Sequence, residues 1–219
     1  MHEQPPSSME ADEWTSRAGG APQLGATTHP PPAGVGSRAA VLVEGISDQF
    51  ALEALARRRG RDLAADGVSI VPIGGATNIG HFLALLGPQG LDLTLAGLCD
   101  AGEEGDFQRG LERAGLGSNL TRADMELLGF YVCVADLEDE MIRSIGAVAV
   151  ERVVDAQGEL GSFRIFQRQP AQRERTLEEQ LRRFMGTRAG RKIRYAPLLV
   201  DALNPGQVPR PLDRLLAHV

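Results

Sequence analysis

The most constraining feature of this sequence is a short apolar run at residues 41–43 (Val-Leu-Val) that ends in an acid, Glu44, followed by a glycine. β-Branched apolar residues bounded by glycine are typical of a buried strand, so Glu44 lies where this strand stops. Residues 49–56 are rich in good helix formers with apolar residues at helical spacing, and Ser47 is the expected cap of that helix. Asp48 then falls in the first helical turn, four residues after Glu44. The two carboxylates are therefore expected to face one crevice.

The alternation of a strand and a helix continues along the chain. Further strands are expected at residues 68–73, 93–99 and 130–134, with helices at 79–86 and 107–114 between them. This rhythm predicts an α/β fold, in which a Rossmann-like parallel sheet of about four strands is flanked by helices on both faces.

Composition divides the chain into three parts. Residues 1–36 are rich in Pro, Gly, Ser and Thr and have almost no aliphatic periodicity, which predicts a disordered tail. Residues 37–146 form the expected α/β core, and residues 147–219 a mainly helical extension that completes the domain. A proline-entered amphipathic helix near the C-terminus would close the core or present a face to a partner.

Acids follow three of the predicted strands, as Glu44, Asp100 and the cluster at residues 136–140 (Asp-Leu-Glu-Asp-Glu). The carboxyl ends of parallel strands share one edge of the sheet, where ligands bind. Crowded carboxylates repel one another unless cations are shared, and Mg²⁺ prefers carboxylate and water oxygens. Two such ions about 4 Å apart can clamp the attacking and leaving oxygens of a phosphoryl transfer. The bland alternative is that the acids follow strands only because loops are polar.

Four motifs resemble those of a known family: residues 43–48 (Val-Glu-Gly-Ile-Ser-Asp), 74–80 (Gly-Gly-Ala-Thr-Asn-Ile-Gly), 98–100 (Leu-Cys-Asp) and 136–140. They look like the Toprim domain of the OLD (overcoming lysogenization defect) nucleases, and the similarity covers roughly residues 39–203. The resemblance implies a metal-dependent endonuclease that hydrolyses phosphodiester bonds of DNA with Mg²⁺, or with Mn²⁺. Full-length OLD proteins join an ABC-type ATPase to this domain, and no Walker A sequence occurs here. A free-standing Toprim unit is thus expected, with nucleic acid, a separate ATPase chain and a second copy of the chain as candidate partners.

The resemblance also implies the residues of the site, with Glu44 as the family's leading glutamate and a catalytic residue. The implied metal ligands are Glu44, Asp48, Asp100 and Glu138. One position departs from the family: Gly102 stands where the second acid of the Asp-x-Asp motif belongs. Glu103, Glu104 or Asp106 could reach back from this turn to substitute for it.

Lys192 is the one lysine among 23 basic residues. Its presence could be due to chance. Alternatively, the position requires a compact ammonium, which behaves differently from a planar guanidinium. OLD nucleases are similar in carrying a lysine near a Gly-Arg-Lys sequence, and the implied role of Lys192 is catalytic, stabilising charge on the scissile phosphate. Lys192 is expected to precede a helix at residues 193–203.

Arginines are dense between Arg164 and Arg194. A solvated helical face and a surface for phosphate groups are the two interpretations. The nucleic-acid-binding candidates in this run are Arg188, Arg191 and Arg194.

A net charge of −6 argues against a protein that coats nucleic acid by charge alone. No apolar run is long enough to span a membrane and no signal-peptide core follows Met1, so a cytoplasmic protein is expected. Two other functions stay open. Gly102 favours a catalytically inactive Toprim module that binds nucleic acid or an ATPase chain. A small-molecule enzyme or a phosphoacceptor at Asp100 is the third interpretation.

Overall fold

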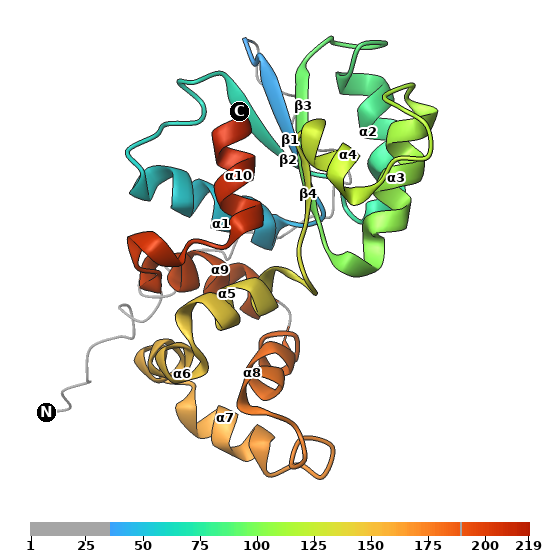
Figure 1. Cartoon of the computed structure of the whole chain (residues 1–219). Coiled ribbons are helices and arrows are strands. Elements are labelled where there is room, and N and C mark those ends of the chain that lie inside the picture. Colours follow the sequence, from blue (N-terminus) through green and yellow to red (C-terminus); the bar gives the residue numbers. More distant parts are fainter. Residues whose placement is uncertain (1–35, 189) are drawn as a thin grey trace, which may run out of the picture.

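The computed structural model describes residues 36–188 and 190–219, so the tail predicted for residues 1–36 lies outside them apart from Gly36. The predicted α/β fold is confirmed. Four parallel strands form one sheet in the order β2-β1-β3-β4 (Figure 1). They are β1 (Ala39–Val43), β2 (Val68–Pro72), β3 (Thr94–Cys99) and β4 (Phe130–Val132). Because β2 and β3 lie on opposite sides of β1, the strand order reverses between β1 and β3, which is where a ligand crevice forms in sheets of this kind.

Helices cover both faces of the sheet, because successive side chains of a strand point to opposite sides. Ala40 and Leu42 belong to the core beneath α2 (Ile79–Leu86), α3 (Glu104–Arg113) and α4 (Arg122–Leu127). Val41 and Val43 face the other side, toward α1 (Ile46–Arg58) and α10 (Arg210–His218). All of β1 is buried, as expected for a central parallel strand covered on both faces.

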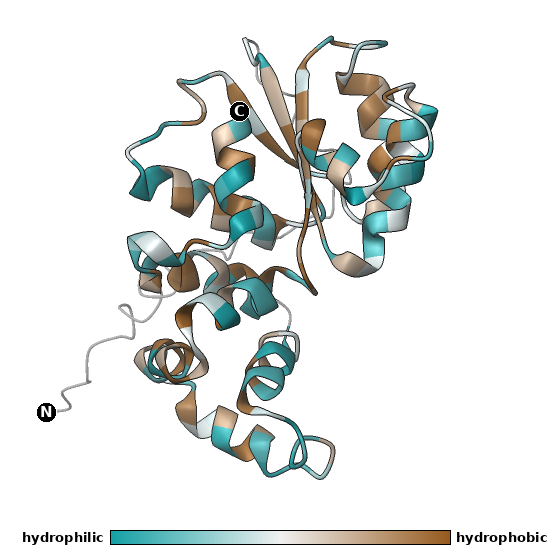
Figure 2. Ribbon diagram, viewed as in Figure 1, coloured by the Kyte–Doolittle hydropathy of each residue, from teal (hydrophilic) through white to brown (hydrophobic). Residues whose placement is uncertain are grey.

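The remaining helices form a lobe beyond the carboxyl ends of the strands (Figure 1). They are α5 (Leu137–Ile145), α6 (Ala147–Ala156), α7 (Leu160–Gln167), α8 (Leu177–Met185) and α9 (Arg191–Ala202). Short 3₁₀ turns complete the chain as η1 (Ala76–Asn78), η2 (Ala101–Glu103) and η3 (Pro205–Gln207). Figure 2 shows largely hydrophobic strands and helices that each have a hydrophilic and a hydrophobic side.

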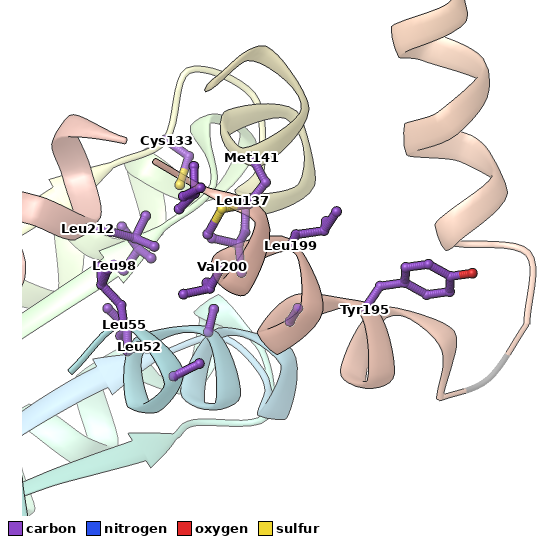
Figure 3. Close-up of a cluster of buried hydrophobic side chains, with 14 of the residues drawn as sticks. Leu52, Leu55, Leu98, Cys133, Leu137, Met141, Tyr195, Leu199, Val200 and Leu212 are labelled. Atoms are coloured by element: carbon purple, nitrogen blue, oxygen red, sulfur yellow. The ribbon is translucent and has the colours of Figure 1, made fainter. Parts of the chain in front are cut away.

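The helical lobe and the sheet share one hydrophobic core. Figure 3 shows Leu199 and Val200 of α9 in one buried cluster with Leu52 of α1, Met141 of α5 and Leu212 of α10. The extension is therefore packed into the fold rather than appended to it. No helix in the described part of the chain is long and apolar enough to cross a lipid bilayer.

Several local predictions were wrong. Helix α1 begins at Ile46 with Gly45 as its N-cap, so Ser47 lies inside the first turn and the Asp48 carboxylate accepts the Gly45 N–H at 2.9 Å. Strand β4 is shorter than predicted because the Val134 N–H turns away to donate to Glu140 Oε1 at 2.7 Å. Lys192 is the second residue of α9 and does not precede it. Helix α4 was not predicted at all.

Candidate metal centre

One side-chain and one backbone hydrogen bond join three strand ends at the point where the strand order reverses. Glu44 follows β1, and its Oε1 accepts the backbone N–H of Asp100, which follows β3, at 2.7 Å. The next residue, Ala101, donates its N–H to the carbonyl of Ala135 after β4 at 3.0 Å. The strand-end acids that the sequence placed at one edge are thus brought together there.

Three carboxylates converge at this edge. Glu44, Asp100 and Glu103 each offer one oxygen, and these oxygens all lie within 4.8 Å of one another. The short 3₁₀ turn η2 returns Glu103 to Asp100, with the Glu103 N–H donating to the Asp100 carbonyl at 3.1 Å. A set of three carboxylates from adjacent strand ends suits a hard divalent cation.

Glu103 and Glu104 differ although they are neighbours in sequence. Glu104 lies outside the three-carboxylate set and forms an ion pair with Arg122, whose Nε donates to Glu104 Oε1 at 3.1 Å. Of the candidate substitutes for the acid missing at Gly102, the structure brings only Glu103, among the described residues, to Glu44 and Asp100.

Burial and mutual repulsion raise the pKa values of the acids at this edge. Burial, followed by the charges of Glu44 and Asp48, raises the pKa of Asp100 to about 8. Burial also raises the pKa of Asp48 to about 7, against the lowering effect of the Gly45 N–H and with help from the charges of Glu138 and Glu44. The pKa of Glu44 is raised chiefly by burial as well, although the Asp100 N–H opposes it. A bound cation would offset this repulsion, so the residues present fit a divalent metal ion.

Glu138 and Lys192 form an ion pair beside the carboxylates. Glu138, in the first turn of α5, is 5% exposed, and its Oε2 accepts from Lys192 Nζ at 2.7 Å. Burial lowers the pKa of Lys192, but the charge and hydrogen bond of Glu138 and the charges of Asp136 and Asp100 outweigh it and raise the pKa. The lone lysine is therefore held as a cation beside Glu44, Asp48, Asp100 and Glu103, the acids that we call the acidic edge. Its side chain is 44% exposed.

The three candidate nucleic-acid-binding arginines have different environments. Arg191 is 4% exposed, and its Nε and Nη2 donate to Glu159 at 3.2 and 3.1 Å. Its guanidinium also lies 3.9 Å from the centre of the Phe184 ring. It is not available to a phosphate group, so its prediction as a nucleic-acid contact is not supported. Arg188 is exposed, and Arg194 is half-exposed with one Nη at 2.5 Å from Glu159.

Glu159 is the structural residue that the sequence did not reveal. Burial raises its pKa, but hydrogen bonds from Arg191, Tyr195 and Arg194 outweigh burial and lower the pKa to about 2. Its hydrogen-bond partners lie more than 30 positions along the chain, on α9. No local spacing in the sequence could have indicated that contact.

Comparisons with known proteins agree with this arrangement. The model of the Overcoming lysogenization defect protein-like TOPRIM domain matches residues 37–101, which include β1 to β3 and the residues Glu44, Asp48 and Asp100. No curated protein matches the chain.

Solved structures from two organisms are similar to this chain. The C-terminal region of the Xanthomonas campestris pv. campestris OLD protein is 24% identical with a TM-score of 0.65, covering 84% of this chain and 92% of that one. The C-terminal region of the Burkholderia pseudomallei OLD protein is 19% identical with a TM-score of 0.65, covering 83% of this chain and 96% of that one. The likeness in fold extends well past the matched residues, into the helical lobe.

Proposed function

We propose that the protein is a divalent-metal-dependent endonuclease that hydrolyses phosphodiester bonds of DNA, a proposal supported by the match of residues 37–101 to the model of an OLD-like TOPRIM domain. The observation that carries the proposal is the convergence of Glu44, Asp100 and Glu103 at two adjacent strand ends. TOPRIM domains generally bind divalent metal, and this carboxylate set is the feature of the described residues that suits one.

Each acid at the edge has a role in the proposal. Glu44, Asp100 and Glu103 would hold one ion, and Asp48 with Glu138 would serve a second, the metal being Mg²⁺ or Mn²⁺. Bound ions of this kind supply an activated water and neutralise charge on the phosphate.

Lys192 has the second catalytic role. Its ammonium is held at the acidic edge by Glu138, where a substrate phosphate would approach, and it would stabilise the negative charge that builds on the phosphate oxygens. Arg188 and Arg194 are exposed enough to contact the DNA backbone elsewhere, whereas Arg191 is not. A separate ATPase chain and a second copy of this chain complete the proposed partners, and the cytoplasm is the proposed compartment.

Nicking of supercoiled plasmid in the presence of Mg²⁺ or Mn²⁺ tests the proposal. We expect the wild type to nick the plasmid only with metal, and Glu44→Gln to lose nicking while remaining folded. Glu104→Gln is the matched control, since it removes the same charge from a neighbouring acid outside the carboxylate set.

Gly102 supports the rival function, an inactive TOPRIM module that only binds nucleic acid or an ATPase chain. The same experiment separates the two. A wild type that neither nicks with any divalent metal nor binds Mn²⁺ in calorimetry would refute the nuclease and favour the binding module.

A further inference from the structure

Arg182, on α8, reaches the acidic edge from the helical lobe. Its Nε donates to Asp136 Oδ2 at 2.7 Å, and 43% of its side chain is exposed. Its two Nη groups make no hydrogen bond within residues 36–188 and 190–219. One edge of the guanidinium is therefore anchored by the protein and the other is turned to solvent.

The anchor of Arg182 is itself fixed. Asp136 is 8% exposed and caps α5, with its Oδ1 accepting the Asp139 N–H at 2.8 Å. Both carboxylate oxygens of Asp136 thus have a hydrogen-bond partner. A residue that caps a helix with one oxygen and holds a guanidinium with the other keeps that guanidinium in one orientation.

Asp136 also stands directly beside the candidate metal centre. The residue before it, Ala135, accepts the N–H of Ala101, the residue after Asp100, at 3.0 Å. The head of Arg182 is thereby tied through Asp136 to the loop that carries the carboxylates. In agreement with this position, burial lowers the pKa of Arg182, but the hydrogen bond to Asp136 and the nearby charges, that of Asp100 among them, raise it.

The start of α5 holds two cations in the same manner. Asp136 holds Arg182 from α8, and two residues later Glu138 holds Lys192 from α9. The start of α5 therefore holds both a compact ammonium and a planar guanidinium. The planar fork matches two oxygens of one phosphate, which an ammonium cannot do.

We propose that Arg182 is a positioning residue that binds, through its free Nη edge, a backbone phosphate of the DNA strand next to the phosphate that reacts. The identity of the ligand as DNA rests on the proposed function, whereas the orientation of the guanidinium rests on the contacts of Asp136. The competing interpretation is an ordinary surface ion pair, which would have no effect on DNA binding.

The test measures DNA binding by the full chain without any divalent metal. Fluorescence anisotropy of a labelled duplex is recorded over a series of salt concentrations with EDTA present. Loss of one phosphate contact makes the negative slope of log K against log salt shallower by about 0.9. The affinity for DNA at low salt then falls roughly tenfold, and by the same factor for duplexes of unrelated sequence. We expect both effects in Arg182→Ala and in Arg182→Gln, the second of which keeps an amide donor for Asp136. Arg182→Lys should retain the slope and lose part of the affinity.

Arg183→Ala is the matched control, because it removes the same charge from the next position of α8. The Nε of Arg183 donates to Gln172 Oε1 at 3.1 Å. We expect the salt dependence of DNA binding by Arg183→Ala to match that of the wild type. An Arg182→Ala protein with the slope and affinity of the wild type would overturn the proposal, as would a wild type that binds no DNA. A wild type that binds DNA with the Arg182-dependent slope but never nicks plasmid would support the phosphate contact and refute the nuclease.

Discussion

Glu103 and Glu104 show how far the surroundings of one side chain decide its role. Glu103 lies with Glu44 and Asp100, whereas Glu104 is neutralised by Arg122. We expect Glu103→Gln to weaken Mn²⁺ binding at least tenfold, about the smallest loss expected on removing a direct ligand, and to abolish nicking. Glu104→Gln should change neither. Isothermal calorimetry measures the Mn²⁺ affinity of both variants. Equal affinities would contradict the assignment of Glu103 as a metal ligand.

Gly102 leaves room for the acid that the family pattern places there. A Cβ at this position would meet no atom within 4 Å, and the backbone of Gly102 is not in the left-handed region. We therefore expect Gly102→Asp to fold and to restore Mn²⁺ binding and nicking to the Glu103→Gln protein. A double variant that binds Mn²⁺ no better than Glu103→Gln would show that the two positions do not serve the same ion.

The raised pKa values of the edge acids predict an unusual dependence of stability on pH. Asp48 and Asp100, with pKa values of about 7 and about 8, are protonated in the folded chain at pH values where the unfolded chain, near 3.8, is ionised. The folded state binds more protons in this window, so without metal the stability contribution is present below pH 4 and is lost as pH rises to 8.

Thermal unfolding in EDTA should therefore give a lower Tm at pH 8.5 than at pH 6, by roughly 2–4 °C for each kcal/mol lost. Stabilisation by added Mn²⁺ should grow over the same range, because the metal binds the ionised carboxylates. Asp100→Asn should flatten the dependence in EDTA. A wild-type Tm that rises with pH in EDTA would argue against protonated acids at this edge.

Among the secondary-structure elements, α9 depends on a buried ionic contact. Arg191 and Glu159 tie its first turn to the loop before α7, and Lys192, the next residue, faces the acidic edge instead. We expect Arg191→Ala to lower the free energy of unfolding by about 1.5–3 kcal/mol, because it removes charged hydrogen bonds from Glu159, which keeps those of Tyr195 and Arg194. Lys192→Ala should also lower the free energy of unfolding, because the buried Glu138 loses its ion-pair partner, and it should in addition abolish nicking. Urea unfolding followed by circular dichroism measures both, and an Arg191→Ala protein as stable as the wild type would refute this role.

The elements also show which parts of the structure could be predicted from sequence. The strands and the acids after them were predictable because an apolar run, its glycine and the acid behind it are neighbours in the chain. The ion pairs Arg182–Asp136 and Lys192–Glu138 join residues 46 and 54 positions apart, and only the packing of α8 and α9 brings them together. Helix α4 is six residues long with one buried side chain, Met125, too short for a helical period to be recognised.

For the molecule as a whole, the shared core makes the helical lobe part of the folding unit. Leu199 and Val200 of α9 and Leu212 of α10 are buried with residues of β1 and α1. We expect a fragment of residues 37–146 to lack a cooperative urea transition, because it would expose that surface, whereas residues 37–219 should unfold in a single transition. Two transitions in the longer protein would indicate that the lobe folds by itself.

The separation of acids and cations along the chain has a consequence for synthesis. The three acids of the carboxylate set are complete at Glu103, whereas Arg182 and Lys192 are added much later and from the lobe. At roughly 5–20 residues per second, the ribosome adds Lys192 roughly 5–20 s after Glu103. In the proposed nuclease, the cations that engage the phosphate would therefore be the last part of the site to be made, together with the helices that complete the shared core.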